Sequence, residues 1–430
     1  DQVESVEGFN VSRTDQLEIT GFSFLVISPG WKESHPLIVK AQAVGIRLVN
    51  EIDLAWSFRA ELVPGQKWIA LTGTNGKTTT VEMAAAMLRA GGVSAIACGN
   101  VGTTVIESVE SPEKYEVLVL ELSSFQLHWI REATFVAAAI LNIADDHLDW
   151  HGTFAEYLAA KKRITDGANL IIINRDDRHL NSLEFNDDQR VVKFTLDAPR
   201  PGEIGVVEEL LVDRAFVADP MEAAMFCELS EVQPTAPHSV SNALAAAGLA
   251  RAIGIDNEVI RSAIKKFRPG RHRIELVLEQ NGIRWIDDSK ATNPHAAQAS
   301  VMSELSVVWI AGGLAKGAEM NELIAQVGSR LRAVVLIGTD RELIAHELQS
   351  NFPNVSIVRV DSKPSHDRSS ADNDFMNQIV TEAKHLAQSG DAVLLAPACA
   401  SMDQFLSYGD RGDRFAKSVR EIVGKNDNAR

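Results

Sequence analysis

The stretch that decides the fold spans residues 68–79 and has the sequence Trp-Ile-Ala-Leu-Thr-Gly-Thr-Asn-Gly-Lys-Thr-Thr. Its apolar start, 68–71, predicts a buried strand, and the residues from Val81 to Ala90 predict a helix. Between them, Gly73 and Gly76 allow backbone N–H groups to turn inward around phosphate oxygens, and the helix N-terminus adds its positive end. A strand, a glycine-rich loop and a helix in this order predict a phosphate-binding loop.

The loop supplies the groups that a nucleoside triphosphate needs. Lys77 offers a point charge to the β- and γ-phosphates, and the hydroxyl of Thr78 can ligate Mg²⁺. Leu71 stands where the strict pattern has its first glycine, so the loop is a variant. The alternative is a chance glycine-rich turn, which the flanking strand and helix disfavour. The predicted ATP-binding residues of the loop are Gly73, Thr74, Asn75, Gly76, Lys77, Thr78 and Thr79.

Short apolar runs, rich in β-branched residues, recur along the chain and are each followed by a helical stretch. Continuous apolar runs are typical of strands that are buried on both faces, which occur in parallel sheets covered by helices. The sequence therefore predicts the α/β class. Asn281-Gly282 lies between two further apolar runs and predicts a hairpin. The predicted buried strands are 24–27, 68–71, 117–120, 136–141, 170–173, 307–310, 334–337 and 393–395.

The chain of 430 residues is long enough for about three domains. Glycine and proline at Pro64-Gly65 and at Pro269-Gly270 suggest two breaks, which gives domains 1–65, 66–268 and 269–430. Roughly 65 residues suffice for only part of a doubly wound unit. The first domain is therefore either a reduced domain or one that lacks its opening strand and helix.

The charge balance limits the possible partners. The chain has 42 Lys and Arg against 58 Asp and Glu, a net charge of −16, which disfavours nucleic acid and anionic lipid as partners. An anionic ligand must then be bound in a local pocket of opposite sign. The three cysteines have no disulfide or metal spacing, and no apolar run reaches the ~18 residues that span a bilayer. Because the start also lacks a signal-peptide pattern, we expect a cytoplasmic protein without membrane insertion.

Carboxylates follow two of the predicted strands. Glu121 ends the run 117–120, and Asp145-Asp146-His147 follows the run 136–141. Both would emerge at the carboxyl edge of the sheet, beside the phosphate loop, where hard oxygen ligands and an imidazole could hold cations. The alternatives are a helix cap for Glu121 and a solvated turn for the second group.

Lys161 lies on the apolar stripe of a predicted helix. Phe154, Leu158 and Lys161 are spaced i, i+4 and i+7, whereas Lys162 points elsewhere. The common explanation, which the sequence alone favours, is a lysine whose stem covers apolar surface while its head stays in water. The alternative is a desolvated, neutral amine that can react with CO₂ to form a carbamate.

Five segments together resemble the Mur ligases, in the order in which that family has them. Within the family, Ser28-Pro29-Gly30, the Ser-Ser-Phe-Gln stretch and residues 397–405 resemble the members that add D-glutamate. The resemblance extends from about residue 24 to residue 416. The five segments are 72–79, 121–126, 142–147, 159–161 and 288–293.

The resemblance implies a Rossmann-like N-terminal domain that binds a UDP-substrate, a central ATPase with a mainly parallel sheet, and a C-terminal Rossmann-like domain. It implies ATP-dependent amide formation in peptidoglycan precursor synthesis, with two Mg²⁺ ions, UDP-N-acetylmuramoyl-L-alanine and D-glutamate as the other participants, and a monomer. The substrate carboxylate would become an acyl phosphate, which the amine of D-glutamate then attacks.

The resemblance also implies a role for individual residues. Lys77, His147 and a carbamylated Lys161 would be catalytic, and cations would be held by Thr78, Glu121, His147 and Lys161. ATP would be bound beyond the loop by Asn242, Arg273, Asp288 and Lys290. The muramyl substrate would contact Ser28 and Asn100, and D-glutamate would contact Thr292, Lys316, Ser401 and Tyr408.

Two departures from the family pattern and two alternatives remain. The family usually has His-Asn where this chain has His238-Ser239, which weakens the adenine contact expected there. The opening strand, loop and helix that carry much of the uridine site are not apparent. One alternative is another amide ligase of the superfamily, such as a folylpolyglutamate synthetase. The other is a nucleotide-dependent switch that uses the same loop without turnover.

Overall fold

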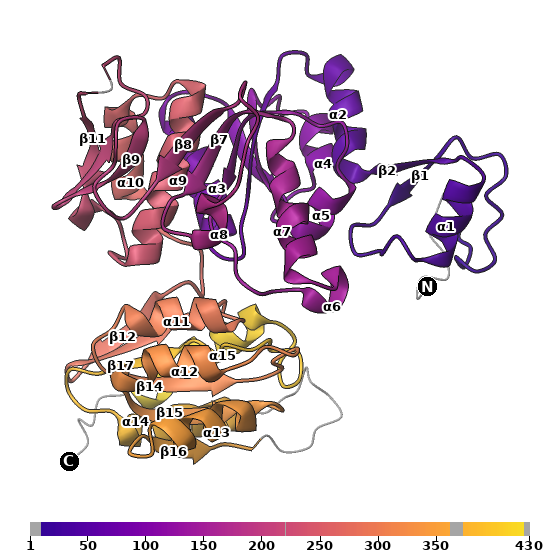
Figure 1. The fold of residues 1–430 in the computed structure, drawn as a ribbon. Coiled ribbons are helices and arrows are strands. Elements are labelled where there is room, and N and C mark those ends of the chain that lie inside the picture. The colour runs from indigo at the N-terminus through magenta and orange to yellow at the C-terminus, as the bar shows by residue number, and fades with distance from the viewer. Residues whose placement is uncertain (1–9, 220, 362–372, 425–430) are drawn as a thin grey trace. The chain divides into compact units, whose positions relative to one another are not determined.

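The computed structural model describes residues 10–219, 221–361 and 373–424 (Figure 1). The chain forms two compact units, and each is described by itself. Unit 1 comprises residues 1–232 and 241–267, and unit 2 comprises residues 233–240 and 268–430. Unit 2 resumes at Arg268, and the predicted domain boundary at residue 269 stays a prediction. The division of unit 1 at residue 65 stays a prediction.

Unit 1 is built on a nine-stranded sheet with the strand order β11-β10-β9-β8-β7-β6-β3-β5-β4. Neighbouring strands from β4 to β9 are parallel, and β10 and β11 add an antiparallel edge. The phosphate-loop strand β3 pairs with both β5 and β6, so the ends of these three strands meet at one edge. The strands are β3 (Lys67–Thr72), β4 (Ala95–Gly99), β5 (Val117–Glu121), β6 (Phe135–Ile140), β7 (Ala168–Asn174), β8 (Arg190–Phe194), β9 (Glu203–Val207), β10 (Leu210–Asp213) and β11 (Ala224–Glu228).

Helices cover both faces of this sheet (Figure 1), which explains why β5 is buried along its whole length. Helices α4, α5 and α7 begin with a reciprocal cap. The side chain of a Ser or Thr accepts from the backbone N–H of the Glu or Gln three residues later, and the side chain of that Glu or Gln accepts from the backbone N–H of the Ser or Thr. The helices are α2 (Glu51–Leu62), α3 (Lys77–Ala90), α4 (Val105–Glu110), α5 (Ser124–Trp129), α6 (Leu148–His151), α7 (Phe154–Lys162), α8 (Arg178–Asn181), α9 (Pro237–Ile253), whose first residues belong to unit 2, and α10 (Asn257–Lys266).

The N-terminal part of unit 1 is a small β-α-β element. Strands β1 (Phe24–Ile27) and β2 (Arg47–Asn50) pair in parallel, and α1 (Pro36–Ala43) connects them. Ile27 and Ile38 pack on Trp129 at the end of α5, so this element shares an apolar contact with the rest of the unit.

Unit 2 has a six-stranded sheet of order β12-β13-β17-β14-β15-β16, which is parallel except for the β12-β13 hairpin. The hairpin turns at Asn281-Gly282, as predicted, because both residues adopt the positive φ that this turn requires. Separate apolar clusters lie on the two faces of the sheet. The elements are β12 (Glu275–Gln280), β13 (Ile283–Asp287), α11 (Pro294–Met302), β14 (Val307–Gly312), α12 (Asn321–Val327), β15 (Leu331–Ile337), α13 (Arg341–Asn351), β16 (Ser356–Arg359), α14 (Asn373–Leu386), β17 (Ala392–Leu395) and α15 (Tyr408–Ile422).

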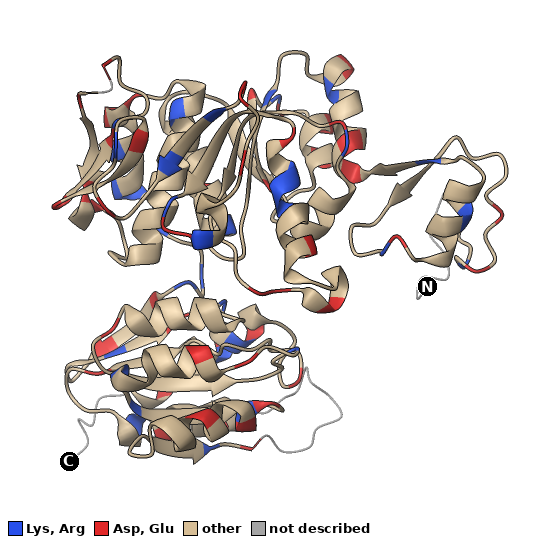
Figure 2. Ribbon diagram, viewed as in Figure 1, with Lys and Arg blue, Asp and Glu red and all other residues tan. Residues whose placement is uncertain are grey.

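The predicted α/β class with mainly parallel sheets is confirmed, and each predicted apolar run lies on a strand. Figure 2 shows acidic and basic residues interspersed along the elements of both units. Among the described residues, none of the helices is long and apolar enough to cross a membrane.

Candidate active site

The phosphate loop has the predicted setting between β3 and α3. Gly76 caps α3 in the left-handed conformation, with φ of 80°. A Cβ atom at this position would meet the side-chain amide of Asn242 on α9, which would have to move, and the positive φ independently favours glycine. The close approach places Asn242, one of the predicted ATP-binding residues, directly against the loop.

Lys77 and Thr78 occupy the first turn of α3. The Lys77 ammonium donates to the carbonyl oxygens of Gly73 and Thr74, both at 2.9 Å, and is held at the mouth of the loop. Thr78 is buried in the first turn of α3. A lysine charge, a hydroxyl and a helix N-terminus are thus gathered where phosphate oxygens would be bound.

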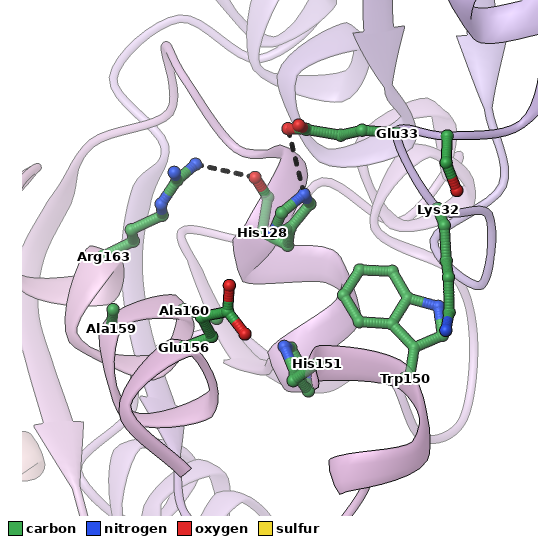
Figure 3. Close-up of a pocket in the computed structure, with 10 residues that line it drawn as sticks. Lys32, Glu33, His128, Trp150, His151, Glu156, Ala159, Ala160 and Arg163 are labelled. Atoms are coloured by element: carbon green, nitrogen blue, oxygen red, sulfur yellow. Dashed lines mark hydrogen bonds and ion pairs between the residues drawn. The ribbon is translucent and has the colours of Figure 1, made fainter. Parts of the chain in front are cut away.

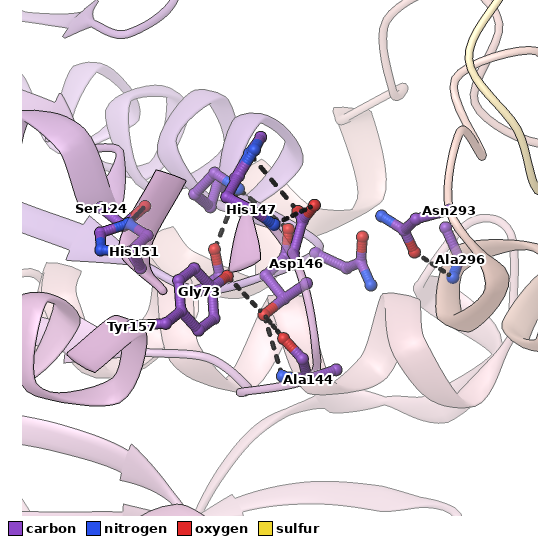
Figure 4. Close-up of polar contacts among 12 residues, drawn as sticks. Gly73, Ser124, Ala144, Asp146, His147, His151, Tyr157, Asn293 and Ala296 are labelled. Atoms are coloured by element: carbon purple, nitrogen blue, oxygen red, sulfur yellow. Dashed lines mark hydrogen bonds and ion pairs between the residues drawn. The ribbon is translucent and has the colours of Figure 1, made fainter. Parts of the chain in front are cut away.

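The loop is fastened to the segment that follows β6 (Figure 4). Asn142 accepts from the N–H of Asn75 at 2.8 Å and donates to its carbonyl oxygen at 3.1 Å. The hydroxyl of Thr74 bonds the hydroxyl of Tyr157 at 2.9 Å and the backbone of Ala144. These bonds fix the loop before any ligand arrives, so little ordering is left for binding.

Lys161 is the residue for which the favoured sequence interpretation is wrong. Its side chain is 2% exposed, and its Nζ donates to the Gly73 carbonyl oxygen at 2.8 Å and to the Thr72 hydroxyl at 3.3 Å. The head of the lysine therefore lies under the phosphate loop and not in water. Burial, together with the nearby charge of Lys77, lowers the pKa of Lys161 well below its usual value.

Glu121 ends β5 beside the loop and is 3% exposed. One carboxylate oxygen accepts from the side-chain amide of Asn100 at 3.0 Å. The other is buried and has no hydrogen-bond partner within the described residues. An orphaned carboxylate oxygen this deep is costly unless a cation or a ligand donor meets it. The helix-cap alternative for Glu121 is not supported, because Ser123 caps the next helix.

His147 precedes α6 in the left-handed conformation, with φ of 54°. Its ring tilts against Phe125 at 4.7 Å, and its Nε2 lies 3.6 Å from a carboxylate oxygen of Asp146. Burial lowers the pKa of His147, with a smaller effect from the charges of Lys161 and Lys77. A neutral imidazole is the form that ligates a cation.

Two participants were not singled out from the sequence. Tyr157 holds the loop through Thr74, and its ring lies 4.9 Å from the Lys161 ammonium. The i, i+4 spacing of Tyr157 and Lys161 on one helix is the signal that could have found it. Asn142 lies in a quoted motif, but its bonds to Asn75 follow from the pairing of β3 with β6, which the sequence does not reveal.

In unit 2, Asp288 directly follows β13 and is buried. It accepts from the N–H of Ile274 at 3.3 Å and from the hydroxyl of Ser300. Burial raises the pKa of Asp288 to about 6, and the guanidinium of Arg273 opposes that rise. Of the residues predicted for ATP, Arg273 and Asp288 are therefore close together.

Lys290 and Tyr408 also meet in unit 2, with the ammonium 4.0 Å from the ring centroid. Their backbones are tied through Ser289, whose hydroxyl donates to the Tyr408 carbonyl oxygen at 2.7 Å. The buried Arg411 donates to both the hydroxyl and the carbonyl oxygen of Ser289. Burial lowers the pKa of Arg411 to about 10, which still leaves it charged at neutral pH.

Lys316 and Ser401 lie on loops that follow β14 and β17. A bridge between Leu314 and Ala400 joins the two loops. Lys316 is exposed, with φ of 52°, whereas Ser401 is buried. Thr292 donates its N–H to the Lys290 carbonyl oxygen and precedes α11. These loops follow the carboxyl ends of parallel strands, which is the edge of an α/β sheet where ligands are usually bound.

Comparisons with known proteins agree with this architecture. Residues 71–250 match the Mur ligase middle domain, and residues 272–399 match the Mur ligase, glutamate ligase domain. The UDP-N-acetylmuramoylalanine–D-glutamate ligase of Thermobifida fusca is 48% identical over 410 residues, covering 94% of this chain and 86% of the relative. The ligase of the same name from Streptomyces coelicolor is 46% identical over 411 residues, covering 94% and 85%.

Among solved structures, the MurF ligase of Thermotoga maritima in complex with ADP superposes with a TM-score of 0.61 at 18% identity, covering 90% of this chain and 91% of that one. This likeness concerns the fold alone. On the sequence relatives and both domain matches, the chain belongs to the Mur ligase family and, within it, to the UDP-N-acetylmuramoylalanine–D-glutamate ligases.

Proposed function

We propose that this chain joins D-glutamate to UDP-N-acetylmuramoyl-L-alanine at the expense of ATP, in the cytoplasmic synthesis of peptidoglycan precursors. The observation that carries the proposal is the Lys161 amine, which is buried and bonded to Gly73 of the phosphate loop. A nucleotide-dependent switch has no use for such an amine, whereas a ligase can convert it to a carbamate that offers two oxygens to a cation.

The reaction begins at the substrate carboxylate. An oxygen of that carboxylate attacks the γ-phosphorus, and the bond to the β-phosphate oxygen breaks, which yields an acyl phosphate and ADP. The amine of D-glutamate then attacks the acyl carbon, loses a proton, and expels inorganic phosphate. Lys77 balances the charge on the phosphoryl oxygens, and the backbone amides of the loop orient them.

The donor set suits Mg²⁺. Thr78 and Glu121 provide oxygens for a first ion, and the orphaned oxygen of Glu121 fits that role. His147 and the carbamate of Lys161 provide ligands for a second ion. Bound there, Mg²⁺ would neutralise the charge that develops on the transferred phosphoryl group.

Formation of the carbamate needs an unprotonated amine. The nitrogen of Lys161 attacks CO₂, a C–N bond forms, and a proton leaves the nitrogen for water. The lowered pKa of Lys161 favours this unprotonated form.

The remaining predicted residues are proposed to bind the ligands. Asn242, Arg273, Asp288 and Lys290 serve ATP, Ser28 and Asn100 serve the muramyl substrate, and Thr292, Lys316, Ser401 and Tyr408 serve D-glutamate. The cation of Lys316 and the hydroxyls of Thr292 and Ser401 suit a side-chain carboxylate. We further propose a monomer that binds no nucleic acid.

The decisive experiment measures ADP release with UDP-N-acetylmuramoyl-L-alanine across a panel of D- and L-amino acids. We expect release with D-glutamate alone. Release with an L-amino acid or with a diamino acid would assign another amide ligase, and release that does not depend on any amino acid would indicate a switch.

A second experiment tests Lys161. Lys161→Ala should lose most ADP release and regain part of it when short-chain carboxylic acids are added, since these can take the place of the carbamate. Lys162→Ala is the matched control, because Lys162 follows on the same helix and its ammonium lies 6.0 Å from the ring of Phe185, away from the loop. Equal losses in the two variants would argue against the role of Lys161.

A further inference from the structure

The segment 28–33, which follows β1, is fastened to α6 by hydrogen bonds from both sides. The indole N–H of Trp150 donates to the carbonyl oxygen of Gly30 at 2.8 Å. In the opposite direction, the Lys32 ammonium donates to the carbonyl oxygen of Asp149 at 2.9 Å. The segment includes the turn Ser28-Pro29-Gly30, in which Ser28 is the residue proposed to contact the muramyl substrate.

His147 immediately precedes the same short helix. The carbonyl oxygen of His147 accepts from the N–H groups of Trp150 and His151, both at 3.0 Å, so the first turn of α6 fixes the backbone of the histidine. The ring of Phe125 contacts His147 at 4.7 Å and Trp150 at 5.0 Å. Trp150 is therefore linked to His147 through both the backbone and a shared aromatic neighbour.

A cavity lies beside this junction (Figure 3). The cavity measures about 340 Å³, and Lys32, His128, Trp150 and His151 are among the residues that line it. The side chains of Lys32 and Trp150, which line this space, join the segment to α6 at its edge. Two further attachments lie on α5: the indole N–H of Trp129 donates to the carbonyl oxygen of Trp31 at 3.2 Å, and Nε2 of His128 lies 3.2 Å from a carboxylate oxygen of Glu33.

We propose that Trp150 is a positioning residue that couples the turn Ser28-Pro29-Gly30 to His147, so that the muramyl substrate and the metal–nucleotide complex strengthen each other's binding. The inference rests on the proposed function, which places substrate at the turn and a cation at His147. Such coupling is reciprocal, so it can be measured from either ligand. One hydrogen bond of ordinary net strength corresponds to a factor of about five in the coupling.

The test is calorimetric titration of UDP-N-acetylmuramoyl-L-alanine into the full chain, without and with Mg²⁺ and a non-hydrolysable ATP analogue. The ratio of the two dissociation constants gives the coupling factor. Trp150→Phe keeps an aromatic ring but loses the donor, and Lys32→Met removes the bond from the other side. We expect both variants to lower the coupling factor by up to about five-fold. Trp129→Phe is the control, since it removes a hydrogen bond to the same segment that does not involve α6, and it should keep the coupling factor.

Three outcomes overturn the inference: a coupling factor of one in the unaltered protein, an unchanged factor in both Trp150→Phe and Lys32→Met, or an equal loss in Trp129→Phe. Failure of the proposed function looks different. In that case the unaltered protein would not bind UDP-N-acetylmuramoyl-L-alanine, or would not release ADP with D-glutamate.

Discussion

Replacing Lys161 with methionine should change how the stability of the protein depends on pH. Methionine has a similar length, is apolar, and suits a site where the lysine is 2% exposed. The buried lysine has a lowered pKa because of desolvation and, to a smaller extent, the charge of Lys77. The unfolded chain, in contrast, titrates this lysine near its ordinary value of about 10.4.

The sign of the effect follows from proton binding. Between the lowered folded pKa and the unfolded pKa, the unfolded chain binds one more proton than the folded chain, so the free energy of unfolding rises with pH in that window. One such group contributes a slope of up to about 1.4 kcal/mol per pH unit. Lys161→Met removes that slope. The unaltered protein should therefore gain stability relative to the variant as the pH is raised from 7 to 9.

The assay is urea unfolding in CO₂-free buffers at pH 7, 8 and 9, with the variant compared with the unaltered protein at each pH so that other titrating groups cancel. Lys162→Met is the control, and its profile should follow that of the unaltered protein. Adding bicarbonate should stabilise the unaltered protein, because the carbamate forms only on the folded amine, and should leave Lys161→Met unchanged. Parallel profiles for Lys161→Met and the unaltered protein across this range would refute a neutral, buried Lys161.

Three further predictions concern Asp53 on α2, Tyr157 on α7 and His151 on α6. Asp53→Ala should lower the free energy of unfolding by about 3 kcal/mol or more in urea titrations, because the carboxylate accepts from three consecutive backbone N–H groups at residues 131–133. Asp53→Asn keeps one acceptor oxygen and should therefore lose less stability. Equal losses in the two variants would contradict this account. Tyr157→Phe should cost about 1 kcal/mol of stability and raise the KM for ATP, since the hydroxyl holds Thr74 of the loop; an unchanged KM would show that the bond does not support the loop. Burial lowers the pKa of His151 to about 4, below its unfolded value, so the unaltered protein should lose stability as the pH falls from 6.5 to 4, and His151→Phe should lose less over that range in thermal melts.

The sheet could be predicted from the sequence because buried parallel strands appear as continuous apolar runs. An uninterrupted run such as Leu170–Ile173 has no solvent-facing position, and the structure confirms it as the interior of β7. The phosphate loop could also be predicted from the sequence, because Gly73 and Gly76 meet the backbone requirements of such a loop and Lys77 supplies its charge. Both features depend on residues that are neighbours in the chain.

Contacts that depend on the order of the strands in the sheet could not be predicted from the sequence. The bonds between Asn75 and Asn142 exist because β3 and β6 are adjacent, although 67 residues separate the two asparagines. The favoured interpretation of Lys161, with its ammonium in water, was wrong for a related reason. Helical spacing shows which face of α7 the lysine occupies, but the depth of that face depends on the loop above it, where Gly73 accepts its bond.

The protein can bind anionic ligands despite its negative net charge, because charges and dipoles within a few ångströms of the ligand determine the binding. A net charge of −16 acts at long range and is screened beyond about 10 Å at ordinary salt, so it governs encounters with large polyanions. Within the phosphate loop, the field comes from the N-terminus of α3 and the ammonium of Lys77, which is fixed by two carbonyl oxygens. A neutral Lys161 adds no charge there, and its conversion to a carbamate would add a negative one. The site can bind ATP in that state only if cations arrive with it, which is why the proposed chemistry requires Mg²⁺ at Glu121 and His147.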